Sequence, residues 1–376
     1  MRSKNSLTNA PPPAGFTSHS SPLTPRPTKV PRALIVAPSW IGDTILAQPL
    51  FAALLRATPG LEIDALAPGW VAPVLRRMPE ISNIIDSPFR HGELALKTRY
   101  RLARRLALLD YDAVYVLPNS LKSALVPFLA RIPRRIGFTG ESRYGLINRR
   151  HHLDKAKLPL MVARFAQLAL APGERPTQTT PHPRIQSSPE QQARTLETLG
   201  LDTAQHPIVF CPGAEYGPAK RWPAGHFARL AQALGERGHT IWLLGSAKDA
   251  EVGDAIATLA GPVCRNLCGS TSLEQAIDLI AVSELVVCND SGLMHVAAAL
   301  DRPLVALFGS SSPGFTPPLS HRAQVLSLQL ECSPCFAREC PLGHLNCLNQ
   351  LEPADVLAAC LAAGAGNVKK SALPAS

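Results

Sequence analysis

The chain lacks the long apolar runs that mark a membrane-spanning or exported protein. No window reaches about 18 uninterrupted apolar residues, so we expect no transmembrane helix. The segment 1–31 is rich in Pro and Ser and contains no apolar core of the kind that a secretory signal needs. We therefore expect residues 1–31 to form a disordered extension.

Aromatic and charged residues are also scarce. Aromatic residues make up 5% of the chain and charged residues 18%, whereas hydrophobic residues make up 46%. This composition argues against wholesale disorder and suits an α/β protein whose helices pack through small residues. A length of 376 residues favours two domains.

Acidic residues are in the minority, since 28 Asp and Glu against 38 Lys and Arg leave a net charge of +10. A basic balance indicates an anionic partner, such as a nucleic acid, an acidic membrane surface or a phosphorylated substrate, unless the basic residues only solvate the surface. The nine cysteines are odd in number and accompany no export signal, which predicts reduced thiols and a cytosolic location.

Apolar runs typical of buried strands alternate with helical stretches in two parts of the chain. We predict strands at residues 32–37, 61–67, 112–118, 207–213, 239–246, 284–290 and 303–309. The expected fold class is α/β, with parallel sheets in two Rossmann-like domains over residues 32–172 and 207–376, and a proline-rich linker over residues 173–206. Ligands of such sheets bind at the carboxyl ends of the strands, so we expect a cleft between the domains.

Asp43 follows the first predicted strand, in the turn Trp40-Ile-Gly-Asp43. A carboxylate at this place can take a proton from an acceptor hydroxyl, a contribution of typically ~10²–10⁴ in rate. The alternative is a plain helix N-cap, a role that Asp fills well.

The second loop reads Cys211-Pro-Gly-Ala-Glu-Tyr-Gly-Pro-Ala-Lys220-Arg-Trp-Pro. Gly213 lets the backbone approach a ligand closely, and Lys220 and Arg221 bring positive charge to the strand end. Such cations can neutralise a diphosphate leaving group, and the loop contains no clear carboxylate pair for a metal. The alternative is an exposed turn with two solvated cations.

Two more loops follow strands. Residues 244–251, Leu-Gly-Ser-Ala-Lys-Asp-Ala-Glu, lack the GxGxxG pattern of dinucleotide dehydrogenases, and Glu251 either accepts hydrogen bonds from a ribose or complements a helix dipole. In residues 288–295, Cys-Asn-Asp-Ser-Gly-Leu-Met-His, the free amides after Asp290 predict an anion site at a helix N-terminus. Asp290 is either an N-cap or a ligand of sugar hydroxyls, and His295 faces either ligand or core.

Four cysteines near the C-terminus are spaced x2, x4 and x6, at Cys332, Cys335, Cys340 and Cys347. Four thiolates with this spacing could hold a structural zinc or iron ion, although only the first pair has metal-knuckle spacing. The alternatives are free thiols or disulfides. A catalytic metal is not expected here, because four thiolates fill a tetrahedral site.

Seven segments of the chain resemble the type II ADP-heptose:lipopolysaccharide heptosyltransferases. They read PSWIGDTILAQPL, LPNSLKSALVPF, GFTGESRYGLIN, CPGAEYGPAKRWP, LLGSAKDAE, NDSGLMHVAAAL and PLVALFGSSSPGFTPPLS, in family order over about residues 32 to 360. The resemblance implies a GT-B fold and an inverting transfer of L-glycero-D-manno-heptose from ADP-heptose to the first heptose of the lipopolysaccharide inner core. It also implies an enzyme that needs no cofactor for catalysis and works at the cytoplasmic face of the inner membrane, in peripheral contact with it.

The resemblance assigns a role to each loop. Asp43 is the catalytic base, and Lys220 neutralises the diphosphate. The implied donor-binding residues are Gly213, Glu215, Lys220, Arg221, Gly245, Ser246, Glu251, Asp290, Ser291, Gly292 and His295. The implied acceptor-binding residues are Trp40, Asn119, Lys122 and Arg143.

Two alternatives are kept beside this interpretation. One is a type I heptosyltransferase, which acts on Kdo-lipid A; the segments LPNSLKSALVPF and GAEYGPAKRWP favour type II. The other is a basic nucleic-acid-binding protein with zinc at the cysteine cluster, but only Phe336 and Arg338 supply the aromatic and basic residues that this would need there. We therefore expect no nucleic-acid partner.

Overall fold

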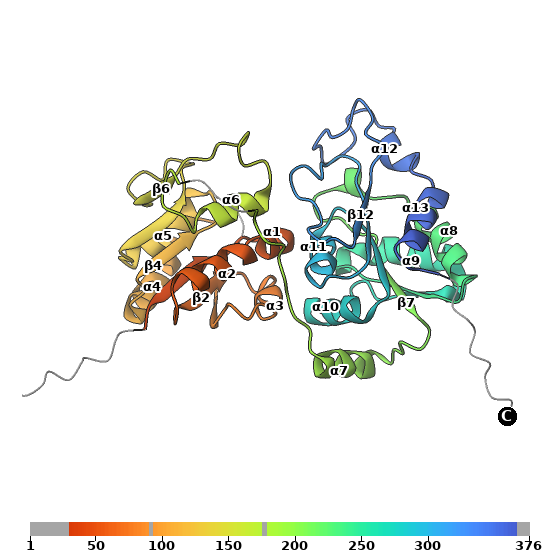
Figure 1. Cartoon of the computed structure of the whole chain (residues 1–376), viewed down its shortest axis with the longest axis horizontal. Helices are drawn as coiled ribbons and strands as arrows, with labels where there is room; N and C mark the ends of the chain where they lie inside the picture. The colour runs from red at the N-terminus through yellow and green to blue at the C-terminus, as the bar shows by residue number, and fades with distance from the viewer. Residues whose placement is uncertain (1–29, 90–92, 175–178, 367–376) are drawn as a thin grey trace, which may run out of the picture. The chain divides into compact units, whose positions relative to one another are not determined.

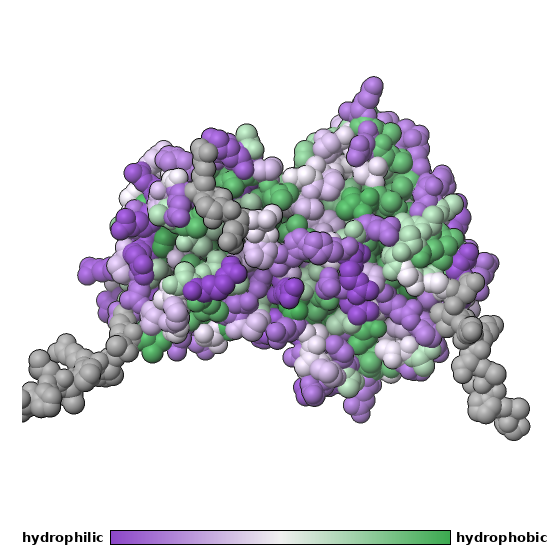
Figure 2. Space-filling model, in the orientation of Figure 1, coloured by the Kyte–Doolittle hydropathy of each residue, from purple (hydrophilic) through white to green (hydrophobic). Residues whose placement is uncertain are grey.

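The computed structural model describes residues 30–89, 93–174 and 179–366. It contains two six-stranded sheets whose neighbouring strands are all parallel (Figure 1). The prediction of an α/β fold with two parallel sheets is therefore confirmed. Figure 2 shows hydrophilic residues over much of one face, with hydrophobic residues in several separate groups.

The first sheet has the strand order β3-β2-β1-β4-β5-β6. Its strands are β1 (Arg32–Val36), β2 (Glu62–Ala67), β3 (Asn83–Asp86), β4 (Ala113–Val116), β5 (Arg134–Phe138) and β6 (Arg149–His151). The helices of this part are α1 (Ile41–Leu46), α2 (Gln48–Ala57), α3 (Ala72–Leu75), α4 (Leu96–Leu106), η1 (Ala107–Leu109), α5 (Leu121–Leu129) and α6 (Met161–Gln167).

The second sheet has the strand order β12-β11-β10-β7-β8-β9. Its strands are β7 (Pro207–Cys211), β8 (Thr240–Leu243), β9 (Cys264–Asn266), β10 (Leu285–Asn289), β11 (Leu304–Leu307) and β12 (Ala323–Leu326). The helices of this part are η2 (Pro218–Lys220), α8 (Ala224–Gly235), η3 (Ala247–Asp249), α9 (Ala250–Ala260), η4 (Gly261–Val263), α10 (Leu273–Val282), α11 (Gly292–Ala299), α12 (Asn346–Asn349) and α13 (Pro353–Ala362).

Central strands are apolar at most positions because helices cover both faces of the sheet. In β7, Ile208 and Phe210 enter one cluster of buried side chains, while Val209 and Cys211 enter another. Successive side chains of a strand point to opposite faces, so this division places apolar packing on both sides. A continuous apolar run is the result.

The segment predicted as a linker contains a helix that the sequence analysis did not predict. Helix α7 (Pro189–Leu199) begins with a capping box in which the Gln191 amide donates to the Ser188 hydroxyl, 3.3 Å away. Thr195 on this helix donates a hydrogen bond of 2.9 Å to Asp278 on α10. The domain limits stay a prediction, and most of the predicted extension, like residues 175–178, lies outside the described residues.

None of the helices in the described ranges is long and apolar enough to cross a membrane.

Candidate active site

The loops singled out from the sequence follow strands of both sheets. The turn containing Asp43 follows β1, the loop containing Lys220 follows β7, and Asp290 follows β10. Each of these strands lies inside its parallel sheet, so its loop emerges where ligands of such sheets bind.

Asp43 lies in the first turn of α1 but does not cap the helix. The N-cap residue is Trp40, which makes no side-chain cap hydrogen bond. The N-cap alternative for Asp43 is therefore wrong. Burial raises the pKa of the Asp43 carboxyl to about 6, because desolvation disfavours its charged form. A carboxylate with this pKa is a stronger base than an ordinary Asp and is still mostly ionised at neutral pH.

Helices α1 and α11 approach each other so closely that glycine is needed on both. A Cβ atom at Gly42 would lie 2.6 Å from His295 Cδ2, and one at Gly292 would lie 2.9 Å from Ile41 Cβ. Contacts this short exclude any side chain at either position without a shift of its neighbours. The residue before Asp43 therefore packs directly on the helix that follows β10.

His295 is buried, with 5% of its surface exposed, and its ring faces Gly42. Its pKa is lowered to about 4, chiefly by burial; Asp290 opposes this shift and Lys220 adds to it. The imidazole is therefore neutral at physiological pH. His295 thus contacts the residue before the predicted base and interacts electrostatically with Lys220, the predicted cation, and with Asp290.

Lys220 and Asp290 form an ion pair. Lys220 Nζ lies 2.5 Å from Asp290 Oδ2, and the exposed fractions of the two side chains are 17% and 6%. The Ser311 hydroxyl donates to the same oxygen over 2.5 Å. Asp290 is not an N-cap, since α11 has Ser291 at that position with no side-chain cap hydrogen bond. The arrangement fixes the ammonium group of Lys220 near an uncapped helix N-terminus, which suits a bound anion.

Asn289 braces the loop that carries Lys220, a role that the sequence analysis missed. Its buried side chain accepts a hydrogen bond from the Trp222 amide over 3.1 Å and donates one to the Pro212 carbonyl over 2.7 Å. Both ends of the loop are thus tied to the end of β10. A polar residue at the end of an otherwise apolar strand was the only signal in the sequence.

Asp249 is a second residue that the sequence analysis missed. Its carboxylate accepts hydrogen bonds from the Ser246 amide over 3.0 Å and from the Ser246 hydroxyl over 2.8 Å. A Cβ atom at Gly213 would lie 2.4 Å from this carboxylate, and one at Gly245 would lie 2.8 Å from Asp249 Cβ. Four predicted donor-binding residues surround it: Gly213, Arg221, Gly245 and Ser246. The Ser-x-x-Asp spacing of a capping box could have identified it.

Two predicted acidic donor ligands lie at the surface. Glu215 forms an ion pair with Lys248, and both side chains are exposed. Glu251 is exposed in the first turn of α9, where an acidic side chain complements the helix dipole. Their contacts with a nucleotide stay a prediction.

The predicted acceptor residues fall into exposed and buried types. Trp40 is 50% exposed and Asn119 is also exposed. Arg143 is only 2% exposed; it donates to the Pro118 carbonyl over 2.7 Å, to Asn119 Oδ1 over 3.1 Å and to the Phe138 carbonyl. Its guanidinium therefore shapes the loop after β4. Lys122 is half-buried in the first turn of α5.

Comparison with known proteins identifies the family. The model of glycosyltransferase family 9 (heptosyltransferase) matches residues 99–346. The chain is 49% identical over 306 residues to lipopolysaccharide heptosyltransferase 2 of Escherichia coli strain K12, covering 79% of this chain and 88% of that relative. The chain belongs to glycosyltransferase family 9.

The structural comparison agrees with this family 9 assignment. The solved structure of the E. coli ADP-heptose lps heptosyltransferase II matches with a TM-score of 0.81 and 43% identity, covering 88% of this chain and 98% of that one. The similarity to lipopolysaccharide heptosyltransferase 1 of E. coli strain RS218 is lower, at 30% identity over 298 residues, covering 75% of this chain and 87% of that relative. The predicted GT-B fold, the enzyme class and the resemblance to the type II heptosyltransferases are confirmed.

In this family 9 chain the cysteine-rich segment packs on the loop that carries Lys220. The Arg338 carbonyl accepts a hydrogen bond of 3.0 Å from the Ala219 amide, and a Cβ atom at Gly217 would lie 2.4 Å from the same oxygen. The Tyr216 hydroxyl donates to the Phe336 carbonyl over 2.9 Å. The segment therefore forms one wall of the Lys220 turn.

The four cysteines of this segment carry free thiols. Cys332 and Cys335 are exposed, whereas Cys347 is buried. Over the described ranges, no group of three or more His, Cys, Asp or Glu side chains is placed to hold a metal ion. The four-thiolate metal site therefore stays a prediction.

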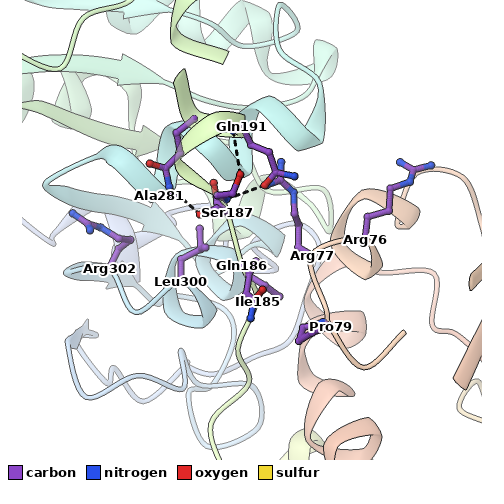
Figure 3. Close-up of a pocket in the computed structure, with 12 residues that line it drawn as sticks. Arg76, Arg77, Pro79, Ile185, Gln186, Ser187, Gln191, Ala281, Leu300 and Arg302 are labelled. Carbon is purple, nitrogen blue, oxygen red and sulfur yellow. Dashed lines mark hydrogen bonds between the residues drawn. The ribbon is translucent and has the colours of Figure 1, made fainter. Parts of the chain in front are cut away.

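A cavity of about 590 Å³ lies away from these loops. It is lined by Arg76, Arg77 and Arg302 together with residues 185–188, 191 and 192 and a few apolar side chains. Figure 3 shows the Arg77 side chain directed at Gln191, to which it donates a hydrogen bond, and Arg77 also pairs with Asp278 over 2.8 Å. No predicted site residue lines this cavity, and its central arginine is already paired.

Proposed function

We propose that this enzyme transfers L-glycero-D-manno-heptose from ADP-heptose to the first heptose of the lipopolysaccharide inner core, with inversion at the anomeric carbon. The observation that carries the proposal is the desolvated carboxylate of Asp43, whose pKa is raised to about 6. Its neighbour Gly42 packs on His295, which interacts electrostatically with Lys220 and Asp290. A single displacement requires one base for the acceptor hydroxyl and positive charge for the leaving group.

Asp43 acts as the base of this reaction. Its carboxylate accepts the proton of the acceptor hydroxyl while the hydroxyl oxygen attacks the anomeric carbon and the bond to the diphosphate breaks. A direct in-line displacement inverts the anomeric centre and needs no protein nucleophile. Neutral His295 does not compete for this proton, because its pKa lies near 4.

Lys220 acts on the leaving group. The ammonium group and the uncapped amides of α11 face growing negative charge on the diphosphate, which fixed donors stabilise without reorganisation. Asp290 keeps Lys220 in place through the 2.5 Å ion pair. With these groups present, we expect transfer to need no metal cofactor.

The remaining predicted ligands complete the donor and acceptor sites. The donor site comprises Gly213, Glu215, Arg221, Gly245, Ser246, Glu251, Ser291, Gly292 and His295, with Asp249 holding several of them in place. The acceptor site comprises Trp40, Asn119, Lys122 and Arg143. Because the acceptor is a lipid, we place the enzyme at the cytoplasmic face of the inner membrane, in peripheral contact with it and without a nucleic-acid partner.

A direct assay separates this proposal from the type I alternative. ADP-heptose is offered with Kdo-lipid A acceptors that carry either no heptose or one heptose. We expect product only from the acceptor with one heptose, an expectation supported by the higher identity to a heptosyltransferase 2 than to a heptosyltransferase 1. Product from the heptose-free acceptor alone would assign the type I reaction instead.

A further inference from the structure

Helix α4 presents an unusual outward face. Its buried side consists of Arg99, Leu102, Ala103 and Leu106. The rest of the helix exposes four cations, Lys97, Arg101, Arg104 and Arg105. Three large apolar side chains are also exposed here, Leu96 (56%), Tyr100 (53%) and, just beyond the helix in η1, Leu108 (84%). We call these seven residues the α4 basic face.

The cations of the α4 basic face are not neutralised locally. Across the described parts of the chain, no hydrogen bond or ion pair holds the side chains of Lys97, Arg101, Arg104 or Arg105. The sequence of α4, LKTRYRLARRL, contains no acidic residue. Long basic side chains among exposed apolar ones are typical of a helix that lies in a membrane interface.

The net charge of the two parts of the chain also favours an anionic partner for the part that contains α4. Residues 31–170 contain 20 Lys and Arg against 10 Asp and Glu, whereas residues 171–376 contain 14 against 18. The net charge is therefore +10 in the first part and −4 in the second. A field of this kind attracts an anionic surface to the half that contains α4.

A buried arginine joins α4 to the predicted acceptor loop. Arg99 Nη1 donates to the Lys122 carbonyl over 2.9 Å, and Arg99 Nε donates to the Leu94 carbonyl over 2.7 Å. Its guanidinium carbon lies 3.9 Å from the centroid of the Phe89 ring. The helix is thus fixed to the first turn of α5, the turn that follows Asn119.

We propose that the α4 basic face docks on an anionic lipid bilayer and so presents the acceptor loop to a lipid-linked sugar. The proposal rests on the lipid acceptor of the proposed function, but the docking can be measured without it. Cations attract the anionic headgroups, while Tyr100, Leu96 and Leu108 enter the boundary between headgroups and acyl chains.

The test uses the full-length chain and vesicles of phosphatidylcholine, with or without phosphatidylglycerol. One variant replaces Lys97, Arg101, Arg104 and Arg105 with Gln. A matched control replaces four other exposed cations, Arg56, Lys155, Arg194 and Arg229, with Gln. Each basic residue at an anionic surface is worth about fivefold in partition coefficient, so we expect at least about 100-fold weaker binding of the first variant to anionic vesicles. The control should lose about tenfold or less.

A Leu108→Ser variant tests the apolar part of the face, and we expect it to weaken binding about tenfold even at high salt. Equal losses in the two four-residue variants, or wild-type binding that ignores lipid charge, would overturn the proposal. A changed oligomeric state of the α4 variant without lipid would assign the face to a second copy of the chain instead.

Activity separates this proposal from the proposed function. The α4 variant should transfer heptose normally to a deacylated, water-soluble acceptor and at least about tenfold more slowly to an acceptor embedded in anionic vesicles. Absence of transfer by the wild-type enzyme to both acceptors would refute the proposed function while the vesicle-binding result still stands. Equal transfer by variant and wild type to the embedded acceptor would refute the role of α4.

Discussion

The two halves of this enzyme use charge in different ways. Around the predicted donor site, Lys220 pairs with Asp290, Arg221 with Asp249 and Lys248 with Glu215. On α4, in the half with the basic excess, four cations have no such partners among the described residues. A small anionic ligand needs donors that are already fixed, whereas a wide anionic surface is attracted by unpaired charge. The difference indicates that the second half is suited to hold a small anionic ligand and the first half to attract an anionic surface.

Removing the predicted base in the first half should show the largest difference between the two halves, because turnover should fall while donor binding is kept. We expect Asp43→Asn to lower kcat by ~10²–10⁴ while the affinity for ADP-heptose is kept, because the predicted donor ligands lie in the other half. The free energy of unfolding of the same variant should be about 1 to 3 kcal/mol higher than that of the wild type, since the variant no longer buries an ionised carboxylate. Steady-state kinetics, calorimetric titration with donor and urea unfolding check this. Near-normal turnover would remove Asp43 from the mechanism.

The donor half should respond with a loss of both rate and stability. We expect Lys220→Met to lower kcat by ~10²–10³, as for loss of one electrostatic donor. It should also cost about 2 to 4 kcal/mol of unfolding free energy, because Asp290 stays buried without its partner.

The matched control is the double variant Lys220→Met with Asp290→Asn. It should regain most of the stability but not the rate. If the rate returned along with the stability, Lys220 would be a structural residue only.

The pH dependence tests the base alone. The pKa of Asp43 is raised to about 6, so we expect kcat/KM to fall about tenfold for each pH unit below 6 as the carboxyl is protonated. Stability should change in the opposite sense: the protonated form is favoured in the fold, so its contribution is lost as pH rises from about 4 through 6. A pH–rate profile that stays flat down to pH 5 would contradict the assignment.

The contact between the halves can be probed at Gly42. We expect Gly42→Ala to lower kcat about tenfold and stability by about 1 to 3 kcal/mol, because the new methyl group collides with the His295 ring 2.6 Å away. Gly225→Ala is the control, since no atom lies within 4 Å of its Cβ position, and it should leave both quantities nearly unchanged. Equal behaviour of the two variants would show that the close packing is not needed.

The smallest effect is expected from chelation. EDTA should leave the transfer rate within about twofold if, as proposed, Lys220 and the N-terminus of α11 supply the positive charge that the diphosphate needs. The assay compares initial rates before and after dialysis against EDTA, with added Mg²⁺ as a second arm. A strict requirement for Mg²⁺ would show that these groups are not sufficient.

The fold was predictable where strands are buried on both faces. Runs such as those of β1, β7 and β10 are apolar at nearly every position, and all three were predicted. Five strands were missed: β3, β5, β6, β9 and β12. Four of them, β3, β6, β9 and β12, are short edge strands whose side chains are mostly exposed or half-buried. Strand β5 was missed because it begins with two arginines that are not buried. An edge strand has only one neighbour, so its sequence carries no continuous apolar run.

Only the site residues that lie in loops after apolar strands were predictable from the sequence. Asp43, Lys220 and Asp290 were predicted because each lies in a loop that follows an apolar run. Ser311 and Asn289 were missed because their roles come from partners that are distant in the chain, Asp290 for one and Trp222 for the other. Such pairings depend on how the strands are ordered in the sheet, which no local pattern states.

The close approach of Gly42 to His295 has a consequence for evolution. Any residue larger than glycine at position 42 occupies the space of the imidazole, so it is tolerated better when the side chain at position 295 is smaller. In a library randomised at both positions and selected for growth, active clones should combine a small residue at one with a bulky residue at the other. Positions 42 and 295 would then change together, although they lie far apart in the gene.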